Sequence, residues 1–334
     1  MTDAIAMKLA FVFPGQGSQA VGMLDSLTAN PVVAEMIIEA DDALGEPLST
    51  LIEKGPADAL ALTVNTQPAM LLAGLACYRA WRAAGGAEAS AFAGHSLGEY
   101  TALTAAGVFD LTSALKLVRL RAQAMQEAVP VGTGGMAVIL GLDDELVREA
   151  CREASESFGA MPGKTGGDSS ANGHMTHVVE PANFNAPAQV VIAGSTAALE
   201  LACELAKKKG AKRAMPLAVS APFHSSLLRP AGDRLGVALR ALSMHRPTAP
   251  VNNNVDVIAN FETDAIIDAL VRQAHSPVRW VEVVLALQAM GITRVIEFGP
   301  GKVLGGMIKR IAPDLKVGAV FDAASLESTL KDFA

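Results

Sequence analysis

The sequence predicts a mixed α/β fold in which a large domain with a parallel sheet carries a smaller, inserted α+β subdomain. Short apolar runs at residues 9–13 and 89–93 have the length and composition of buried strands. Longer patterns at 99–106 and 112–126 are typical of helices. A glycine-rich break at 131–135 interrupts this order, and a new set of elements follows it. Alternating strands and helices favour a parallel sheet, and the break favours an insertion.

The elements of the insertion share short lengths and apolar faces. They are a strand at 136–142, a helix at 144–157, a strand at 189–193 and a helix at 195–209. These elements predict a small ferredoxin-like α+β subdomain at 132–209, within a discontinuous large catalytic domain at 1–131 and 210–334. Residues 159–173 are rich in Gly, Ser and Asn, and we expect them to form a mobile loop.

A G-x-S-x-G motif, GHSLG at 94–98, stands between the second predicted strand and the helix after it. This is the setting of the nucleophile elbow of α/β-hydrolase-like domains. A strained turn there presents the serine, here Ser96, and free N–H groups at the helix start face a developing oxyanion. A glycine-punctuated turn without chemistry has the same pattern, so the motif alone leaves both interpretations open.

Composition and charge limit the function classes. The chain has 334 residues, 51% of them hydrophobic, which is enough for a large core. Its net charge of −7 disfavours a nucleic-acid partner. Three widely spaced cysteines, Cys77, Cys151 and Cys203, indicate reduced thiols and a cytoplasmic protein. The N-terminus lacks the order of a signal peptide.

The longest uncharged stretch, residues 59–78, has polar side chains near its middle. These side chains argue against a membrane span, so we expect a loop that leads into a buried helix, and no membrane partner.

Elimination among six histidines selects His224 as the general base. It lies in a turn after a strand and before a helix, a place from which a base can reach a neighbouring nucleophile. His95 is adjacent to the serine and points elsewhere. His174, His177 and Glu180 have the spacing of metal ligands on a helix, but they span a glycine-rich loop and a strand and so do not share a helix face. We therefore expect neither a metal nor a cofactor.

Motifs in a fixed order extend over nearly the whole chain. They are FPGQGSQ at 13–19, QPA at 67–69, GHSLGE at 94–99, MQEAVP at 125–130, NFN at 183–185, QVVIAG at 189–194, PFH at 222–224, NNV at 253–255, PVRW at 277–280 and GPGKVL at 299–304. In these motifs the chain resembles the malonyl-CoA:acyl carrier protein transacylases of fatty-acid synthesis and the acyltransferase domains of polyketide synthases. So many ordered motifs are more specific than any one of them.

The resemblance implies a catalytic dyad of Ser96 and His224, with a backbone carbonyl near Gln273 holding one nitrogen of the histidine. It also implies that backbone N–H groups of Gln16 and Leu97 form the oxyanion hole. The residues between the serine and the histidine do not mark a buried triad carboxylate convincingly. A carbonyl can orient an imidazole without adding a negative charge.

Arg121 is the candidate substrate clamp. Its helix neighbours at three and four positions are Leu117, Val118, Ala124 and Met125. Because these are apolar, the guanidinium points inward and needs an anionic partner. An internal salt bridge is one such partner; the resemblance favours a substrate carboxylate held bidentately. It also assigns Met125 and Phe223 to substrate binding, and the Phe223 ring favours plain malonyl over methylmalonyl.

The predicted function is transfer of malonyl from malonyl-CoA to the phosphopantetheine thiol of acyl carrier protein, through a malonyl-serine intermediate. We expect this activity to supply fatty-acid chain elongation, since no synthase domain is fused to the chain. A thioester or ester hydrolase would use the same elbow with water as acceptor. A subunit that binds acyl carrier protein without catalytic activity would keep only the surface that binds the carrier.

Overall fold

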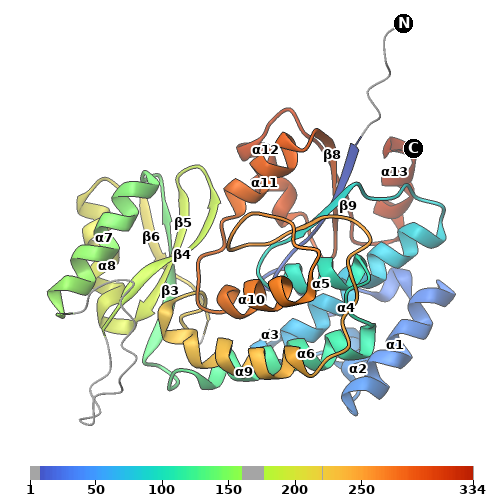
Figure 1. Cartoon of the computed structure of the whole chain (residues 1–334), viewed down its shortest axis with the longest axis horizontal. Coiled ribbons are helices and arrows are strands. Elements are labelled where there is room, and N and C mark those ends of the chain that lie inside the picture. Colours follow the sequence, from blue (N-terminus) through green and yellow to red (C-terminus); the bar gives the residue numbers. More distant parts are fainter. Residues whose placement is uncertain (1–7, 160–176, 220, 334) are drawn as a thin grey trace, which may run out of the picture. The chain divides into compact units, whose positions relative to one another are not determined.

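Two sheets, one parallel and one antiparallel, organise the chain (Figure 1). The computed structural model describes residues 8–159, 177–219 and 221–333. The chain divides into unit 1, Met1–Gln123, Ala238–Ile267 and Glu282–Ala334, and unit 2, Ala124–Val237 and Asp268–Val281. The divisions fall within helices α6 (Leu111–Glu127), α9 (Arg229–Arg240), α10 (Thr263–Gln273) and α11 (Trp280–Ala289).

The sheet of unit 1 is parallel throughout, as the alternation of strands and helices predicts. Its strands are β1 (Lys8–Phe13), β2 (Ala91–Gly94), β7 (Val251–Asn252), β8 (Ile292–Phe298) and β9 (Lys316–Val320), in the order β7-β2-β1-β8-β9. The central strand β1 is almost wholly apolar because both of its faces are covered. Phe11 pairs in register with Phe92 and Ile296 and is fully buried.

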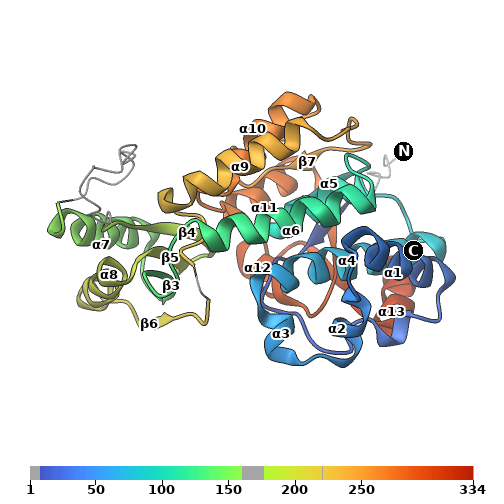
Figure 2. The same cartoon turned by 90° about the horizontal axis from the view of Figure 1, so that it is seen from below.

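Most of the helices of the described chain belong wholly to unit 1. They are η1 (Asp25–Leu27), α1 (Pro31–Leu44), α2 (Leu48–Lys54), α3 (Ala57–Ala61), α4 (Thr63–Ala83), α5 (Leu97–Ala105), α12 (Val303–Ile311) and α13 (Ala323–Phe333). Figure 2 shows α1, α2 and α13 gathered around α4. Within the part of the chain that the structure describes, no helix has both the length and the apolar character needed to cross a bilayer.

Helix α4 begins earlier than the sequence suggests. We expected a loop at the polar residues before the buried helix, but the helix starts at Thr63 and includes Pro68. The polar side chains hold the helix start instead of forming a loop. Thr66 Oγ1 donates to Leu60 O at 2.6 Å, and Asn65 Nδ2 donates to Ala59 O at 2.9 Å.

Glu297, near the end of β8, is a fully buried carboxyl that holds the start of α12. Its Oε1 accepts from Leu304 N at 3.0 Å, and its Oε2 accepts from Gly305 N at 2.7 Å. Burial raises the pKa of Glu297 to about 7, although these backbone N–H groups act in the opposite direction.

The raised pKa of Glu297 predicts a pH-dependent stability. The folded state holds the proton more tightly than the unfolded chain, where the pKa is near 4.5, so stability falls as pH rises from 4.5 through about 7. Glu297→Gln cannot titrate. Its free energy of unfolding, from urea titrations at pH 5 and pH 8, should fall less than that of the wild type, by up to about 3 kcal/mol. Parallel pH profiles for the two proteins would contradict this account.

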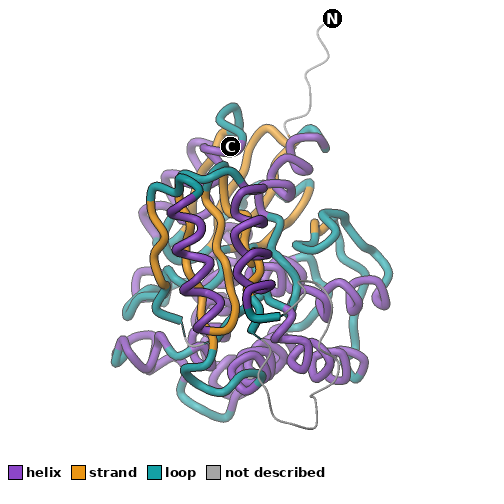
Figure 3. The backbone as a smooth tube through the Cα atoms, turned by 90° about the vertical axis from the view of Figure 1, so that its left-hand side faces the viewer, coloured by secondary structure: helices purple, strands orange, loops and turns teal. Residues whose placement is uncertain are grey.

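Unit 2 contains an antiparallel sheet with two helices on one face, as Figure 3 shows. The elements, in chain order, are β3 (Gly134–Leu140), α7 (Asp144–Ser157), β4 (Val179–Ala186), β5 (Gln189–Ser195), α8 (Thr196–Lys208), β6 (Arg213–Pro216) and η2 (Ser226–Leu228). The strand order is β4-β5-β3-β6. Helices α7 and α8 contribute apolar side chains such as Val147, Ala150 and Ala202 to the core beneath them.

Unit 2 extends beyond the expected boundary at residue 209. Strand β6 pairs with β3, with Ala214 opposite Ile139, so the sheet is completed by residues after α8. Residues 124–131, 210–237 and 268–281, which we expected in the large domain, also belong to this unit. Of the expected loop at 159–173, residues 160–173 lie outside the described residues.

Candidate active site

Ser96 stands at the turn between β2 and α5, where the motif predicts it. Its backbone has φ 53° and ψ −110°, a strained combination for a residue with a side chain. The strand, the sharp turn and the helix therefore form the strand-turn-helix arrangement that a nucleophile elbow requires.

Glycines allow the backbone around the elbow to pack closely. A Cβ on Gly98 would lie 2.0 Å from Phe13 O, and a Cβ on Gly15 would lie 2.8 Å from His95 O. His95 N donates to Phe13 O at 3.0 Å, which ties the elbow to the end of β1. No residue with a side chain fits at these glycine positions without displacing this backbone.

Arg121 on α6 points inward, as its apolar neighbours predict, and only 1% of it is exposed. Its Nη2 donates to Ser96 Oγ at 3.1 Å, and its Nη1 donates to Gln67 Oε1 at 2.9 Å. The guanidinium lies over the ring of Tyr100, with Cζ 5.1 Å from the ring centroid. Burial lowers the pKa of Arg121, while Tyr100 and Glu99 act in the opposite direction. The structure thus places a cation beside the serine hydroxyl.

The sequence did not assign functional roles to Gln67, Tyr100 and Asn254, which contact these residues. Gln67 is 1% exposed, within α4, and it orients Arg121. Asn254 Oδ1 accepts from Ser96 N at 2.7 Å. The available signal for Gln67 was its place in the QPA motif, directly before the apolar part of α4, because a buried amide needs a partner.

The two expected oxyanion-hole residues occupy different settings. Leu97 is buried, and as the first residue of α5 its N–H has no acceptor within the helix. Gln16 is exposed, in the loop that follows β1. The neighbouring Gly15 packs against His95, so this loop lies against the elbow.

His224 and Gln273 come together in unit 2. His224 is 3% exposed and has φ 62°, and its Nδ1 lies 2.8 Å from Gln273 O. This is the contact that the resemblance implies. A carbonyl oxygen can only accept, so Nδ1 carries the hydrogen and Nε2 is left as a proton acceptor.

Met125 and Phe223 lie in one apolar cluster of unit 2, with exposed fractions of 1% and 5%. Met136, Val191 and Leu228 belong to the same cluster. The ring that precedes His224 is therefore held by packing, not by solvent-exposed contacts.

His177 and Glu180 have other partners than a metal. His177 Nδ1 lies 3.4 Å from Ser195 Oγ, and its ring packs on Phe158. Glu180 Oε2 accepts from Ser226 N at 2.6 Å. His174, the third residue with metal-ligand spacing, lies outside the described residues.

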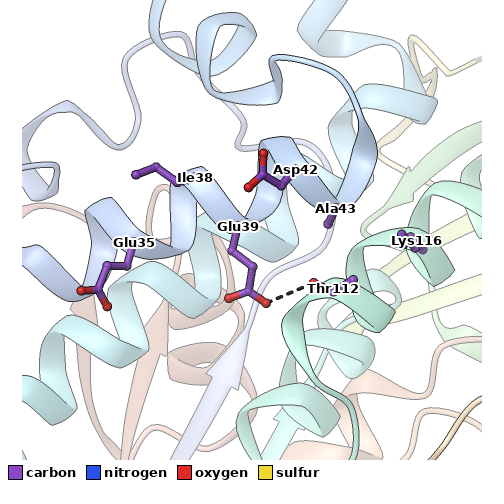
Figure 4. Close-up of a pocket in the computed structure, with 7 residues that line it drawn as sticks. All are labelled: Glu35, Ile38, Glu39, Asp42, Ala43, Thr112 and Lys116. Carbon is purple, nitrogen blue, oxygen red and sulfur yellow. Dashed lines mark hydrogen bonds between the residues drawn. The ribbon is translucent and has the colours of Figure 1, made fainter.

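A separate surface pocket lies between α1 and α6, as Figure 4 shows. It is lined by Glu35, Ile38, Glu39, Asp42, Ala43, Thr112 and Lys116. Glu39 Oε1 accepts from Thr112 Oγ1 at 3.2 Å. Neither Ser96 nor Arg121 lines this pocket; Lys116, its lining residue nearest to Arg121 on α6, precedes that arginine by five residues, or about 7 Å along the helix axis.

Comparison with known proteins finds relatives that match nearly the whole chain. The malonyl CoA-acyl carrier protein transacylase of Escherichia coli K12 is 47% identical over 325 residues, covering 97% of this chain and 99% of that protein. The crystal structure of an acyl-carrier-protein S-malonyltransferase from Burkholderia pseudomallei 1710b is 58% identical, with a TM-score of 0.90, and the match covers 97% of this chain and 100% of that one.

A third relative was solved as a complex of a type II polyketide-synthase acyl carrier protein with its malonyl-transacylase. It is 47% identical, with a TM-score of 0.90, and the match covers 97% of this chain and 99% of that one. The profile of the acyl transferase domain matches residues 10–316. The chain therefore belongs to the acyl transferase domain family, among the malonyl-CoA:acyl carrier protein transacylases.

Proposed function

We propose that this protein transfers the malonyl group of malonyl-CoA to the phosphopantetheine thiol of acyl carrier protein, through a malonyl ester on Ser96. The observation that carries the proposal is the buried Arg121, whose Nη2 lies 3.1 Å from Ser96 Oγ. Malonyl has its carboxylate only two carbon-carbon bonds from the thioester carbonyl. A guanidinium this close to the nucleophile suits such a short diacid.

In the first half-reaction, His224 Nε2 takes the proton of Ser96 Oγ, which attacks the thioester carbonyl of malonyl-CoA. The contact of His224 Nδ1 with Gln273 O supports this role, because it leaves Nε2 free of hydrogen. Backbone N–H groups of Leu97 and Gln16 stabilise the oxyanion. The carbon-sulfur bond then breaks, and the CoA sulfur leaves with the proton from the histidine.

In the second half-reaction, the thiol of the carrier's phosphopantetheine arm gives its proton to His224 and attacks the malonyl ester. The ester bond breaks, Ser96 Oγ recovers the proton, and the carrier leaves as its malonyl thioester. Acyl transfer of this kind needs a proton acceptor, an oxyanion site and a nucleophile, which are side-chain and backbone groups; we propose no bound cofactor or metal.

The relatives support the proposed acyl donor and acyl acceptor. The Escherichia coli relative is named for malonyl CoA and acyl carrier protein, and a second relative was solved with an acyl carrier protein bound. We therefore propose that this chain supplies malonyl units for fatty-acid chain elongation.

The three cysteines are free, which favours a cytoplasmic location.

Strand connections support finer descriptions of the two sheets. The β-α-β-β-α-β order of unit 2, with sheet order β4-β5-β3-β6, favours a ferredoxin-like subdomain. In unit 1, a parallel sheet with a serine between β2 and α5 favours an α/β-hydrolase-like domain.

A transfer assay tests the proposed function. The enzyme is mixed with malonyl-CoA and a carrier protein that bears its phosphopantetheine arm, and the masses of carrier and released acid are measured. We expect the carrier to gain one malonyl group faster than free malonate forms. Rapid malonate release with or without carrier would identify a hydrolase, and an unchanged carrier with intact malonyl-CoA would identify a subunit without activity.

The family resemblance at Phe223 predicts acyl selectivity. Phe223→Ser should raise the specificity constant for methylmalonyl-CoA relative to malonyl-CoA by about tenfold, because the resemblance implies that this ring lies beside the acyl group. Competition between the two thioesters, with the acyl-carrier products weighed, measures the ratio. Phe184→Ser, in the separate core under α7 and α8, is the matched control. An unchanged ratio in Phe223→Ser would remove this residue from substrate selection.

A further inference from the structure

The backbone of Ser96 needs support from outside its own turn. A residue with a side chain rarely adopts φ 53° with ψ −110°, so neighbouring groups must hold it there. The preceding strand supplies Gly94, and the following helix supplies Glu99. Contacts that join all three positions to one fixed point would stabilise the elbow.

Asn254 is such a point. Its Oδ1 accepts from Ser96 N at 2.7 Å, its Nδ2 donates to Gly94 O at 2.7 Å, and its backbone N donates to Glu99 Oε2 at 2.9 Å. Asn254 is fully buried and Glu99 is 2% exposed. The asparagine follows β7, which pairs with β2 in the sheet, so the elbow is fastened to the neighbouring strand.

We propose that Asn254 and Glu99 form a buried brace that positions the Ser96 hydroxyl for acyl transfer. The brace joins strand end, nucleophile and helix α5 through hydrogen bonds of two buried residues, Asn254 and Glu99. The inference rests on the proposed function, because it takes Ser96 as the nucleophile. Asn254 and Glu99 are positioning residues, since they act through the backbone of the elbow and not on the substrate.

The brace also decides which N–H groups serve the oxyanion. Asn254 Oδ1 occupies the N–H of Ser96, so this group is committed to the elbow. The next N–H, that of Leu97, has no acceptor within α5 because it begins the helix. An elbow that lost the brace would turn the hydroxyl and the Leu97 N–H away from the acyl carbonyl together.

Single-turnover acylation tests the brace. The wild type and each variant are mixed with saturating malonyl-CoA, quenched on the millisecond scale and weighed, which gives a rate constant and an amplitude. Asn254→Ala should lower the rate constant roughly 100-fold, since small misplacements of a reacting group have effects of this size. In a second series with varied malonyl-CoA, the concentration that gives half the maximal acylation rate should stay within about threefold of the wild-type value. The ratio of malonyl to acetyl acylation should not change, because Arg121 is untouched.

Further variants separate positioning from folding. Glu99→Gln keeps an acceptor for Asn254 N and should retain the rate within about threefold, whereas Glu99→Ala should not. Asn254→Asp keeps the acceptor for Ser96 N but loses the donor to Gly94 O, so an intermediate loss of about tenfold is expected. It preserves the size of the side chain and replaces Asn254→Ala if that protein does not fold.

Asn253→Ala is the matched control. Asn253 Oδ1 accepts from Asp256 N at 2.7 Å and Nδ2 donates to Ile258 O at 2.9 Å, so it has comparable bonds in the same segment but none to the elbow. A loss of folded protein lowers the amplitude, whereas a loss of positioning lowers the rate constant. Asn254→Ala or Asn254→Asp acylating at the rate of the control would overturn the brace. Failure of the proposed function is distinct, since the wild type itself would then not be malonylated.

Discussion

His224→Ala is expected to slow malonylation of Ser96 by about 10² to 10⁴-fold, the range for loss of a general base. The histidine Nδ1 is fixed by Gln273 O at 2.8 Å, so only Nε2 is available to take the serine proton. Alanine leaves the hydroxyl protonated and removes the proton donor for the departing thiol. Quenched-flow acylation with malonyl-CoA measures the rate constant directly.

His177→Ala is the matched control for this prediction. Its ring contacts Ser195 and Phe158, so its loss removes a histidine of unit 2 without touching Gln273. We expect a rate within about twofold of wild type. Activity that chelators abolish and zinc restores would contradict the dyad and would indicate a metal site at His174 and His177.

Arg121→Ala is expected to remove roughly 2–5 kcal/mol of interaction with the malonyl group, the scale for one partner of a buried charged pair. Acetyl-CoA has no carboxylate, so its transfer should fall much less. The ratio of the malonyl and acetyl specificity constants should therefore drop by about 30-fold or more. Both constants come from the same steady-state assay with purified carrier protein.

Two variants control the arginine prediction. Arg121→Lys should rescue only partly, because an ammonium keeps the charge and loses the two-pronged geometry. Arg119→Ala removes a cation from the same helix, but Arg119 pairs with Glu46, so the malonyl-to-acetyl ratio should stay unchanged. Equal losses of both substrates in Arg121→Ala would make Arg121 a structural residue.

Local patterns predicted much of the fold and the inward turn of Arg121. Strand β1, helix α6 and the elbow follow from apolar runs, helical spacing and paired glycines, all of which act between near neighbours in the chain. The burial of Arg121 follows from the side chains one turn away on its own helix. These features need no information about distant segments.

Features that depend on distant pairing were not predictable in this way. Asn254 is 158 residues from Ser96, and Gln67 is 54 residues from Arg121, so no local spacing links them. Strand β6 belongs to unit 2 because it pairs with β3, which an apolar run cannot indicate. The early start of α4 depends on contacts between its polar side chains and α3.

The central claim is a malonyl ester on Ser96, and intact mass after brief mixing with malonyl-CoA alone tests it most directly. The account predicts that the wild type and Ser113→Ala, a serine at the start of α6, each gain one malonyl group, and that Ser96→Ala gains none. Equal labelling of Ser96→Ala would contradict the account.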